Sequence, residues 1–256
     1  MFGFHRSKAK AFRFGKARAR ADKRTLKFSK YVTPEMPVPP ASYTALDRVA
    51  KAFGTSDVSK IFPMDGNDRY GDCVFAGAAH MVTNFAGLVG EKNVPCEKQV
   101  VSAYLKWTGG VDEGTVMIDM IKEWVKSGFF GEKIDAFVSL HRADHLDVKR
   151  AIFYFGGVYL GFEVQDACLS DFENGTPWTP GPTDGSGHCV AILGYDDKYL
   201  YILTWGGIIR ATWDWWDRMV DEAYVLLSIK AKNPKFDPGF NYAQLEKDLQ
   251  AIKRAA

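Results

Sequence analysis

The feature that most constrains the fold of this 256-residue chain is a change of hydrophobic period at Gly156-Gly157. Before that pair, apolar residues recur at the spacing of helices; after it, β-branched and aromatic residues form short runs separated by turn residues. Helices followed by strands, rather than alternating with them, predict an α+β fold with an antiparallel second half. The expected helices cover 44–53, 72–88, 96–106, 115–127, 147–155 and 241–254. The expected strands cover 158–164, 188–194, 199–204, 208–212 and 223–229.

Charge separates an N-terminal arm from the rest of the chain. Residues 1–30 hold eleven Lys and Arg but one acid, Asp22, so the net charge of +2 divides into +10 on the arm and −8 on the remaining residues. A segment this charged cannot bury enough apolar surface to fold alone. It is typical of polyanion binding, of anchoring in an assembly such as a virus or phage particle, or of an organelle transit peptide. The residues expected to bind a polyanion or a partner are Arg6, Lys8, Lys10, Arg13, Lys16, Arg18, Arg20, Lys23 and Arg24.

Proline content and charge together give the expected organisation. A basic arm (1–30) and a Pro-rich tether (31–43) precede one folded domain (44–235), and a C-terminal extension with a helix (236–256) follows it. A hydrophobic content of 46%, with 14% aromatic residues, is ample for a core. No apolar run is long enough to span a membrane, and no secretory signal follows the N-terminal charges.

The number and spacing of the cysteines indicate the redox compartment and argue against disulfide and zinc sites. The four cysteines, at 73, 96, 168 and 189, are too scattered for a disulfide scaffold or a zinc ribbon. They favour a reducing compartment, such as the cytoplasm of a cell or host cell, or a virion. His80 lies seven residues after Cys73 on the same helix face, but these two residues alone do not favour a metal site, and we expect no metal and no cofactor.

Cys73 is the first candidate for chemistry. It stands in the first turn of an expected helix, behind a Gly-containing turn and the capping residue Asp72. At a helix N-terminus the macrodipole and the free backbone N–H groups favour the thiolate, which is the nucleophilic form of cysteine. Six residues earlier, Asn67 offers a side-chain amide for a developing oxyanion. The alternative is a structural cysteine on a core helix.

His188 is the second candidate. A glycine-rich segment, Asp184–Gly187, leads to this histidine at the start of an apolar strand, where it is placed to act as a base at the edge of a cleft. The alternative is an ordinary surface or core histidine. Cys189 points to the opposite face of the strand and is expected in the core. Further along, the tryptophans either line a groove or pack in a core or interface, and the acids between and after them are expected on a solvated face. These residues are Trp213, Trp215, Trp216, Asp214, Asp217, Asp221 and Glu222.

Over roughly residues 60–230, these segments resemble papain-type cysteine peptidases in their order and spacing. The resemblance consists of the helix-borne cysteine with an amide six residues earlier, the later strand Gly-His-x-Val-Ala-x-x-Gly-Tyr, and a hairpin that ends in Leu-Thr-Trp-Gly. It implies a helical N-terminal half that carries the cysteine and an antiparallel β half that carries the histidine, as in a divergent phage or bacterial homologue. It also implies that Cys73 is the nucleophile, His188 the base and Asn67 the oxyanion donor. Asp72, Gly187 and Trp205 would then line the site.

One departure from the family leaves the function open. The family has an asparagine that orients the histidine, whereas this chain has Leu203, which cannot hydrogen-bond an imidazole. Thr204 is the remaining candidate for that role, although we expect its side chain to face the other side of the strand. The chain is therefore either a cysteine hydrolase acting on peptide or amide bonds through a Cys73–His188 pair, or a weakly active or inactive papain-fold protein. In the second case its arm would hold it in a large assembly or on nucleic acid.

Overall fold

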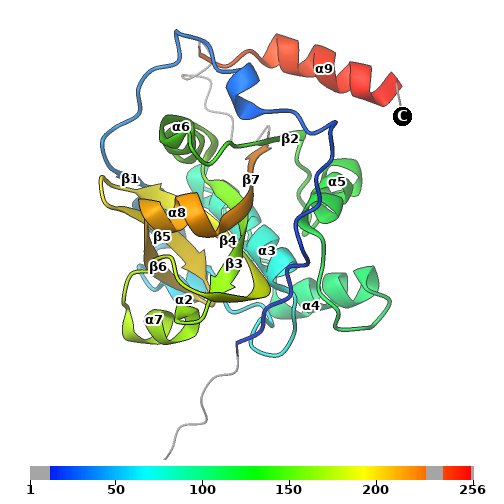
Figure 1. The fold of residues 1–256 in the computed structure, drawn as a ribbon. Helices are drawn as coiled ribbons and strands as arrows, with labels where there is room; N and C mark the ends of the chain where they lie inside the picture. The colour runs from blue at the N-terminus through cyan, green and yellow to red at the C-terminus, as the bar shows by residue number, and fades with distance from the viewer. Residues whose placement is uncertain (1–11, 229–238, 255–256) are drawn as a thin grey trace, which may run out of the picture.

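The computed structural model describes residues 12–228 and 239–254. The helices are α1 (Leu46–Phe53), α2 (Val58–Ile61), α3 (Cys73–Leu88), α4 (Glu97–Trp107), α5 (Met117–Ser127), α6 (His145–Phe155), α7 (Cys168–Asn174), α8 (Trp213–Met219) and α9 (Tyr242–Arg254), with a 3₁₀ turn at Phe28–Lys30. The strands are β1 (Tyr43–Thr44), β2 (Ala136–Ser139), β3 (Val158–Gln165), β4 (Thr183–Tyr195), β5 (Tyr199–Thr204), β6 (Gly207–Thr212) and β7 (Val220–Leu227). The predicted α+β class, with helices before strands, is confirmed (Figure 1).

The strands of the described ranges form one antiparallel sheet in the order β2-β7-β3-β4-β5-β6, with β1 paired to the end of β4. Along β4 the side chains alternate between two cores, as the period of a strand requires. Cys189 and Ala191 pack with α3 on one face, and Val190 and Ile192 pack on the other face, with residues of α6 and α8. The sheet is therefore buried on both sides, which explains its nearly continuous apolar runs.

The helix α3 is the central element of the helical half. All of its residues are buried, because it packs on β4 on one side and contacts α1 and α4 on others. The helix begins at Cys73, where the carbonyl oxygen of Asp72 accepts hydrogen bonds from Phe75 (2.7 Å) and Ala76 (3.0 Å). The nucleophile candidate thus stands at the start of a helix whose residues are all buried.

The described part of the basic arm does not stand free of the body. In Figure 1 this dark-blue segment runs between the strands and helices α4 and α5, and then continues toward α9. Phe28, Tyr31 and Met36 are buried in the same core as Phe240, which anchors both the end of the arm and the Pro-rich stretch that we expected as a tether. Arg6, Lys8 and Lys10 lie outside the described residues.

Several elements differ from the sequence-based expectation. The strand that we expected to start at His188 begins at Thr183, so the glycine-rich segment is part of β4 rather than a loop. The hydrophobic pattern of the sequence did not predict α2, α7, α8 or β2. The tryptophans of α8 divide between two surroundings: Trp215 and Trp216 are fully buried in the core, and Trp213 is partly buried against it.

Candidate active site

Cys73 is positioned by the first turn of α3 and is almost completely covered, with 1% of its surface exposed. Burial raises the pKa of its thiol to about 11. Hydrogen bonding with the main chains of Cys189 and Gly15 lowers this pKa, but by less than burial raises it. All four cysteines are free thiols. The site therefore holds a protonated sulfur at neutral pH, with an N-terminal arm residue close beside it.

His188 is held on β4 and is also 1% exposed. Its Nε2 lies 2.8 Å from the hydroxyl oxygen of Thr204. Its Nδ1 is buried and has no hydrogen-bond partner among the described residues. Burial lowers the pKa of the imidazole to about 3. The imidazole thus has one nitrogen anchored by Thr204, while the other has no partner in the described part of the chain.

The contact between His188 and Thr204 corrects our expectation that Thr204 faces away. In the sheet, Ala191 pairs with Leu203, so these two side chains share a face. His188 precedes Ala191 by three residues and Thr204 follows Leu203 by one, which puts both on the opposite face. The register therefore turns Leu203 away from His188 and places the hydroxyl of Thr204 against the imidazole.

Trp205 covers the ring of His188. Its ring stacks on His188 with a centroid distance of 4.6 Å and an interplanar angle of 18°. Trp205 and Gly206 both have positive φ, at 47° and 73°, which closes the two-residue turn between β5 and β6. A tryptophan in this left-handed conformation is strained by about 1 kcal/mol or more. The tight turn is what brings the indole over the imidazole.

Asn67 lies in the turn before α3 and is 3% exposed. Its side-chain amide donates to the carbonyl oxygens of Tyr70 (3.2 Å) and of Arg13 in the arm (3.1 Å). The Arg13 amide in turn donates to the carbonyl oxygen of Asn67 (2.9 Å). The donor that we expected for an oxyanion is thus occupied by a peptide carbonyl of the same chain.

The arm crosses the site as an extended peptide held by its main chain. The Lys16 amide donates to the carbonyl oxygen of Gly187, the residue before His188 (3.1 Å). On the other wall, the Thr115 amide donates to Gly15 (2.8 Å) and the Ala17 amide donates to Thr115 (2.9 Å). These bonds join the arm to both halves of the fold. They explain why Cys73 and His188 are inaccessible.

Glycines make this close approach of two main chains possible. A Cβ atom on Gly15 would lie 1.8 Å from the carbonyl oxygen of Gly71, which is far below van der Waals contact. On Gly114 it would lie 2.2 Å from the carbonyl oxygen of Gly15. On Gly187 it would lie 2.4 Å from the carbonyl oxygen of Lys16. The cleft is thus fitted to a peptide backbone, a signal that sequence reasoning missed.

Aromatic residues of the arm cap the histidine side of the cleft. Phe14 meets the His188 ring edge-on with a centroid distance of 5.6 Å, and Phe12 contacts Trp205 at 4.8 Å. Phe12 also meets Phe172 of α7 edge-on at 5.8 Å. Phe12 and Phe14 of the arm are therefore packed on the candidate site of their own chain.

The described basic residues of the arm fall into two groups. Lys16 is buried and forms ion pairs with Asp221 and Glu222, two acids that we expected on a solvated face. The others are exposed, and three of them have acidic partners: Arg20 pairs with Asp119, Arg24 with Asp22 and Lys30 with Asp248. The exposed residues are Arg13, Arg18, Arg20, Lys23, Arg24, Lys27 and Lys30.

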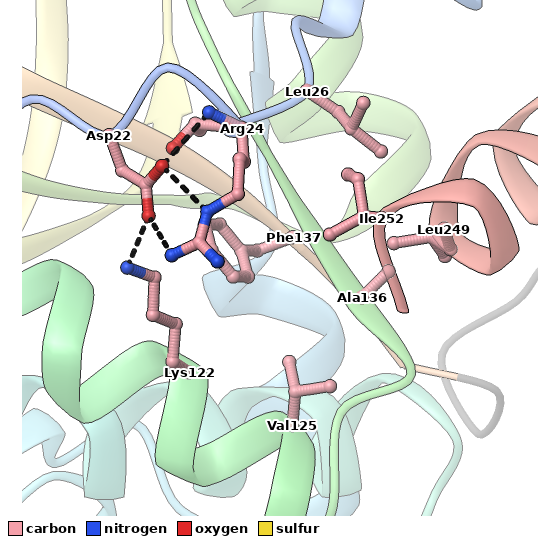
Figure 2. Close-up of a pocket in the computed structure, with 10 residues that line it drawn as sticks. Asp22, Arg24, Leu26, Lys122, Val125, Ala136, Phe137, Leu249 and Ile252 are labelled. Atoms are coloured by element: carbon pink, nitrogen blue, oxygen red, sulfur yellow. Dashed lines mark hydrogen bonds and ion pairs between the residues drawn. The ribbon is translucent and has the colours of Figure 1, made fainter. Parts of the chain in front are cut away.

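A second contact site, beside a hollow between the arm, α5, β2 and α9, fixes the later part of the arm (Figure 2). Asp22 accepts hydrogen bonds from Arg24 (2.9 Å) and from Lys122 of α5 (2.6 Å). The apolar wall of the hollow includes Phe137 and Leu249. The arm is thus fastened at a point remote from Cys73, so a local change in the cleft does not release its whole length.

Asp72 and His80, the other polar residues that the sequence placed near Cys73, are both buried. Asp72 is fully buried, and its carboxyl oxygens have no hydrogen-bond partner in the described part of the chain. Burial raises the pKa of that carboxyl to about 8. His80 lies 2.8 Å from the carbonyl oxygen of Pro63. No group of three or more metal-ligating side chains is found among the described residues, and none of their helices is long and apolar enough to cross a membrane.

Comparisons with known proteins were made on sequence and on structure. No family model and no curated protein matches the sequence. Among solved structures, xylellain, a cysteine protease from Xylella fastidiosa, matches with a TM-score of 0.58 at 18% identity, covering 87% of this chain and 98% of that one. Procathepsin L2 from the Tenebrio molitor larval midgut matches with a TM-score of 0.53 at 13% identity, over 73% of this chain and 68% of that one. The Carica candamarcensis cysteine protease CMS1MS2 matches with a TM-score of 0.51 at 14% identity, over 74% of this chain and 99% of that one.

These matches fix the class of fold. The chain has the papain-like fold, with a helical half and an antiparallel β half, as the sequence resemblance implied. At such low identity the likeness shows the fold alone, and the chemistry has to be argued from the residues of this chain.

Proposed function

We propose that this chain is a latent cysteine hydrolase that cleaves peptide or amide bonds with Cys73 and His188, and that its own arm covers the site. The observation that carries the proposal is the seating of residues 13–17. The groups flanking the cysteine and the histidine bind an extended peptide through its main chain, as a cleft for peptide substrates must. A carbonyl oxygen of that peptide already accepts from the Asn67 amide.

The residues supply each step of an acyl transfer. With Nε2–H donating to Thr204, the His188 Nδ1 takes the proton of the Cys73 thiol, and the sulfur attacks the substrate carbonyl carbon. The Asn67 amide and the Cys73 backbone N–H donate to the resulting oxyanion. Collapse breaks the carbon–nitrogen bond, and His188 returns the proton to the leaving amine. Water then attacks the thioester, giving the carboxylic acid and the free thiol.

The covered state is inactive for two physical reasons. The arm occupies the position of a substrate, and burial keeps the pKa of Cys73 high and that of His188 low, so the reactive thiolate is scarce. Displacing residues 13–17 hydrates both groups and lets the two pKa values approach each other.

A full-length variant with a displaced arm tests this function. Gly15→Ala puts a Cβ against the Gly71 carbonyl and is expected to lift the arm from the cleft. We expect this variant to hydrolyse fluorogenic peptide amides, and the further change Cys73→Ala to abolish the activity. Cys168→Ala, which changes a buried cysteine of α7, serves as the matched control. Hydrolysis that survives Cys73→Ala would contradict the proposal.

A second role for the arm stays a proposal beside the first. The side chains of Arg13, Arg18 and Lys23 are exposed although the main chain around them is seated on the body. These charges are available to a polyanion or to an assembly. Binding of the full chain to nucleic acid, measured against salt concentration, tests this role: a loss of binding in an Arg18→Gln/Lys23→Gln variant supports it, and unchanged binding contradicts it.

A further inference from the structure

The side chain of Lys16 turns from the cleft into a closed pocket between β3, β7 and the start of α5. The side chain is 1% exposed, and its ammonium lies 2.7 Å from Asp221 Oδ2 and 3.3 Å from Glu222 Oε1. It also donates to the carbonyl oxygen of Ala17 (3.2 Å). Lysine is almost never this deeply buried unless its charge is paired, as the charge of Lys16 is here with two carboxylates.

The pocket is shaped for a long, unbranched side chain. A Cβ on Gly161 of β3 would lie 1.9 Å from Lys16 Cε and 2.8 Å from Met117 Sδ. The φ angle of Gly161 is not positive, so the backbone conformation does not require glycine here. Glycine is needed because a larger residue would fill the space that the Lys16 side chain occupies. Gly161 pairs in the sheet with Glu222 on one side and with Cys189 on the other. The pocket therefore opens next to the residue that follows His188.

The acidic end of the pocket is built by the body and does not depend on the arm. The Tyr224 hydroxyl donates to Glu222 Oε2 (2.8 Å), which leaves Oε1 to face the Lys16 ammonium. The side chain of Glu222 is 6% exposed and that of Asp221 is 24% exposed. When the arm leaves, two partly buried carboxylates remain on the wall of the cleft with no cation between them. Burying such charges without a partner is unfavourable, so a ligand that supplies a cation is favoured.

From this geometry we infer that the Lys16 pocket, formed by Gly161, Met117, Asp221 and Glu222, selects peptide substrates with a lysine or arginine side chain at the position that enters it. The inference rests on the proposed function and names its substrate class. Lys16 occupies the pocket as a basic substrate side chain would, while the main chain around it fills the cleft.

Pairs of peptides that differ in one ammonium group test the inference. Fluorogenic tripeptide amides carry lysine or norleucine, which has the same length without the charge, at each of three positions in turn. In the full-length Gly15→Ala variant, we expect kcat/KM to favour lysine by about tenfold or more at one position, the value typical of a charged hydrogen bond. Glu222→Gln combined with Asp221→Asn in that background removes both carboxylate charges, keeps the bond to Tyr224 and should reduce the preference to about twofold. Glu173→Gln, an exposed acid on α7, should leave it unchanged.

Gly161→Ala provides a second variant with a different prediction. The added methyl group takes the space of Lys16 Cε, so cleavage of lysine and norleucine peptides should fall while cleavage of alanine peptides persists. Equal cleavage of lysine and norleucine peptides at every position would overturn the inference and leave the proposed hydrolase standing. A lysine preference that survives Glu222→Gln combined with Asp221→Asn would also overturn it. Cleavage of no peptide, with Cys73 unreactive, would overturn the hydrolase and the inference together.

Discussion

Gly15→Ala gives the sharpest test that the arm holds the site closed. The methyl group would lie 1.8 Å from the Gly71 carbonyl oxygen and 2.2 Å from its carbonyl carbon. Neither atom yields easily, because the Gly71 amide is bonded to Asp112 (2.8 Å). Gly15 has no positive φ, so alanine suits its backbone conformation and the clash alone acts. The arm therefore has to leave the cleft at this point.

The magnitude follows from the thiol. The pKa of Cys73 is about 11 in the covered site against an ordinary value of 9.0. Since tenfold more thiolate forms for each pKa unit lost, full hydration of the sulfur raises the thiolate population at pH 7 about 100-fold. Alkylation by iodoacetamide follows the thiolate, so its rate at Cys73 should rise by about that factor, and steric exposure adds to it.

Peptide mass mapping after timed alkylation measures the rate at each cysteine in one sample. Cys96 is exposed and serves as the internal reference, and the buried Cys168 and Cys189 report any general unfolding. Gly181→Ala is the matched control, because its new Cβ would meet only Gln165 Cβ, at 3.5 Å. An unchanged Cys73 rate in a folded Gly15→Ala variant would refute the idea that the arm closes the site.

Three further predictions follow from the same contacts. Thr204→Val removes the hydroxyl at His188 Nε2 and should lower kcat by about tenfold or more, with KM little changed and with recovery in Thr204→Ser, as steady-state kinetics on Gly15→Ala protein would reveal. Asp72 holds its proton more tightly folded (pKa about 8) than its ordinary value of 3.8, so the folded state binds more protons between these pH values and stability falls as pH rises. Asp72→Asn should flatten the unfolding free energy across that window by about 1 kcal/mol per pH unit, and urea titrations that keep the wild-type slope would contradict this. Tyr31→Phe loses the hydroxyl bond to Asp248 of α9 (2.7 Å) and should lower the unfolding free energy by about 1 kcal/mol. An unchanged unfolding free energy in urea titrations would contradict this contact.

The sequence predicted the elements whose pattern is local. The helix α3 and the strand β4 have strong periods, and the glycine, cysteine and histidine signals on them lead to Cys73 and His188. The short helices α7 and α8 were missed. A helix of one or two turns is too short for its hydrophobic periodicity to be distinguished from a loop. The tryptophans of α8 are also compatible with either a groove or a core.

The path of the arm could not be read from the sequence because it depends on distant partners. In the sequence, Lys16 cannot be distinguished from the solvated charges around it. Its buried position depends on Asp221 and Glu222, which lie about 205 positions later and are brought beside it only by the fold. Gly15 gives no signal of its own, because its role is set by the approach of Gly71. Thr204 was assigned to the wrong face for a related reason: the pairing register of β4 and β5 is not contained in either strand alone.

The most direct measurement of the central claim is the mass of the enzyme during turnover. Gly15→Ala protein mixed with a slowly hydrolysed peptide ester should gain the mass of the acyl group, and fragmentation should locate it on the Cys73 peptide. The same experiment with His188→Ala should give little or no adduct. An adduct on Cys96 instead, or ester hydrolysis with no acylated Cys73 at any time, would contradict the account.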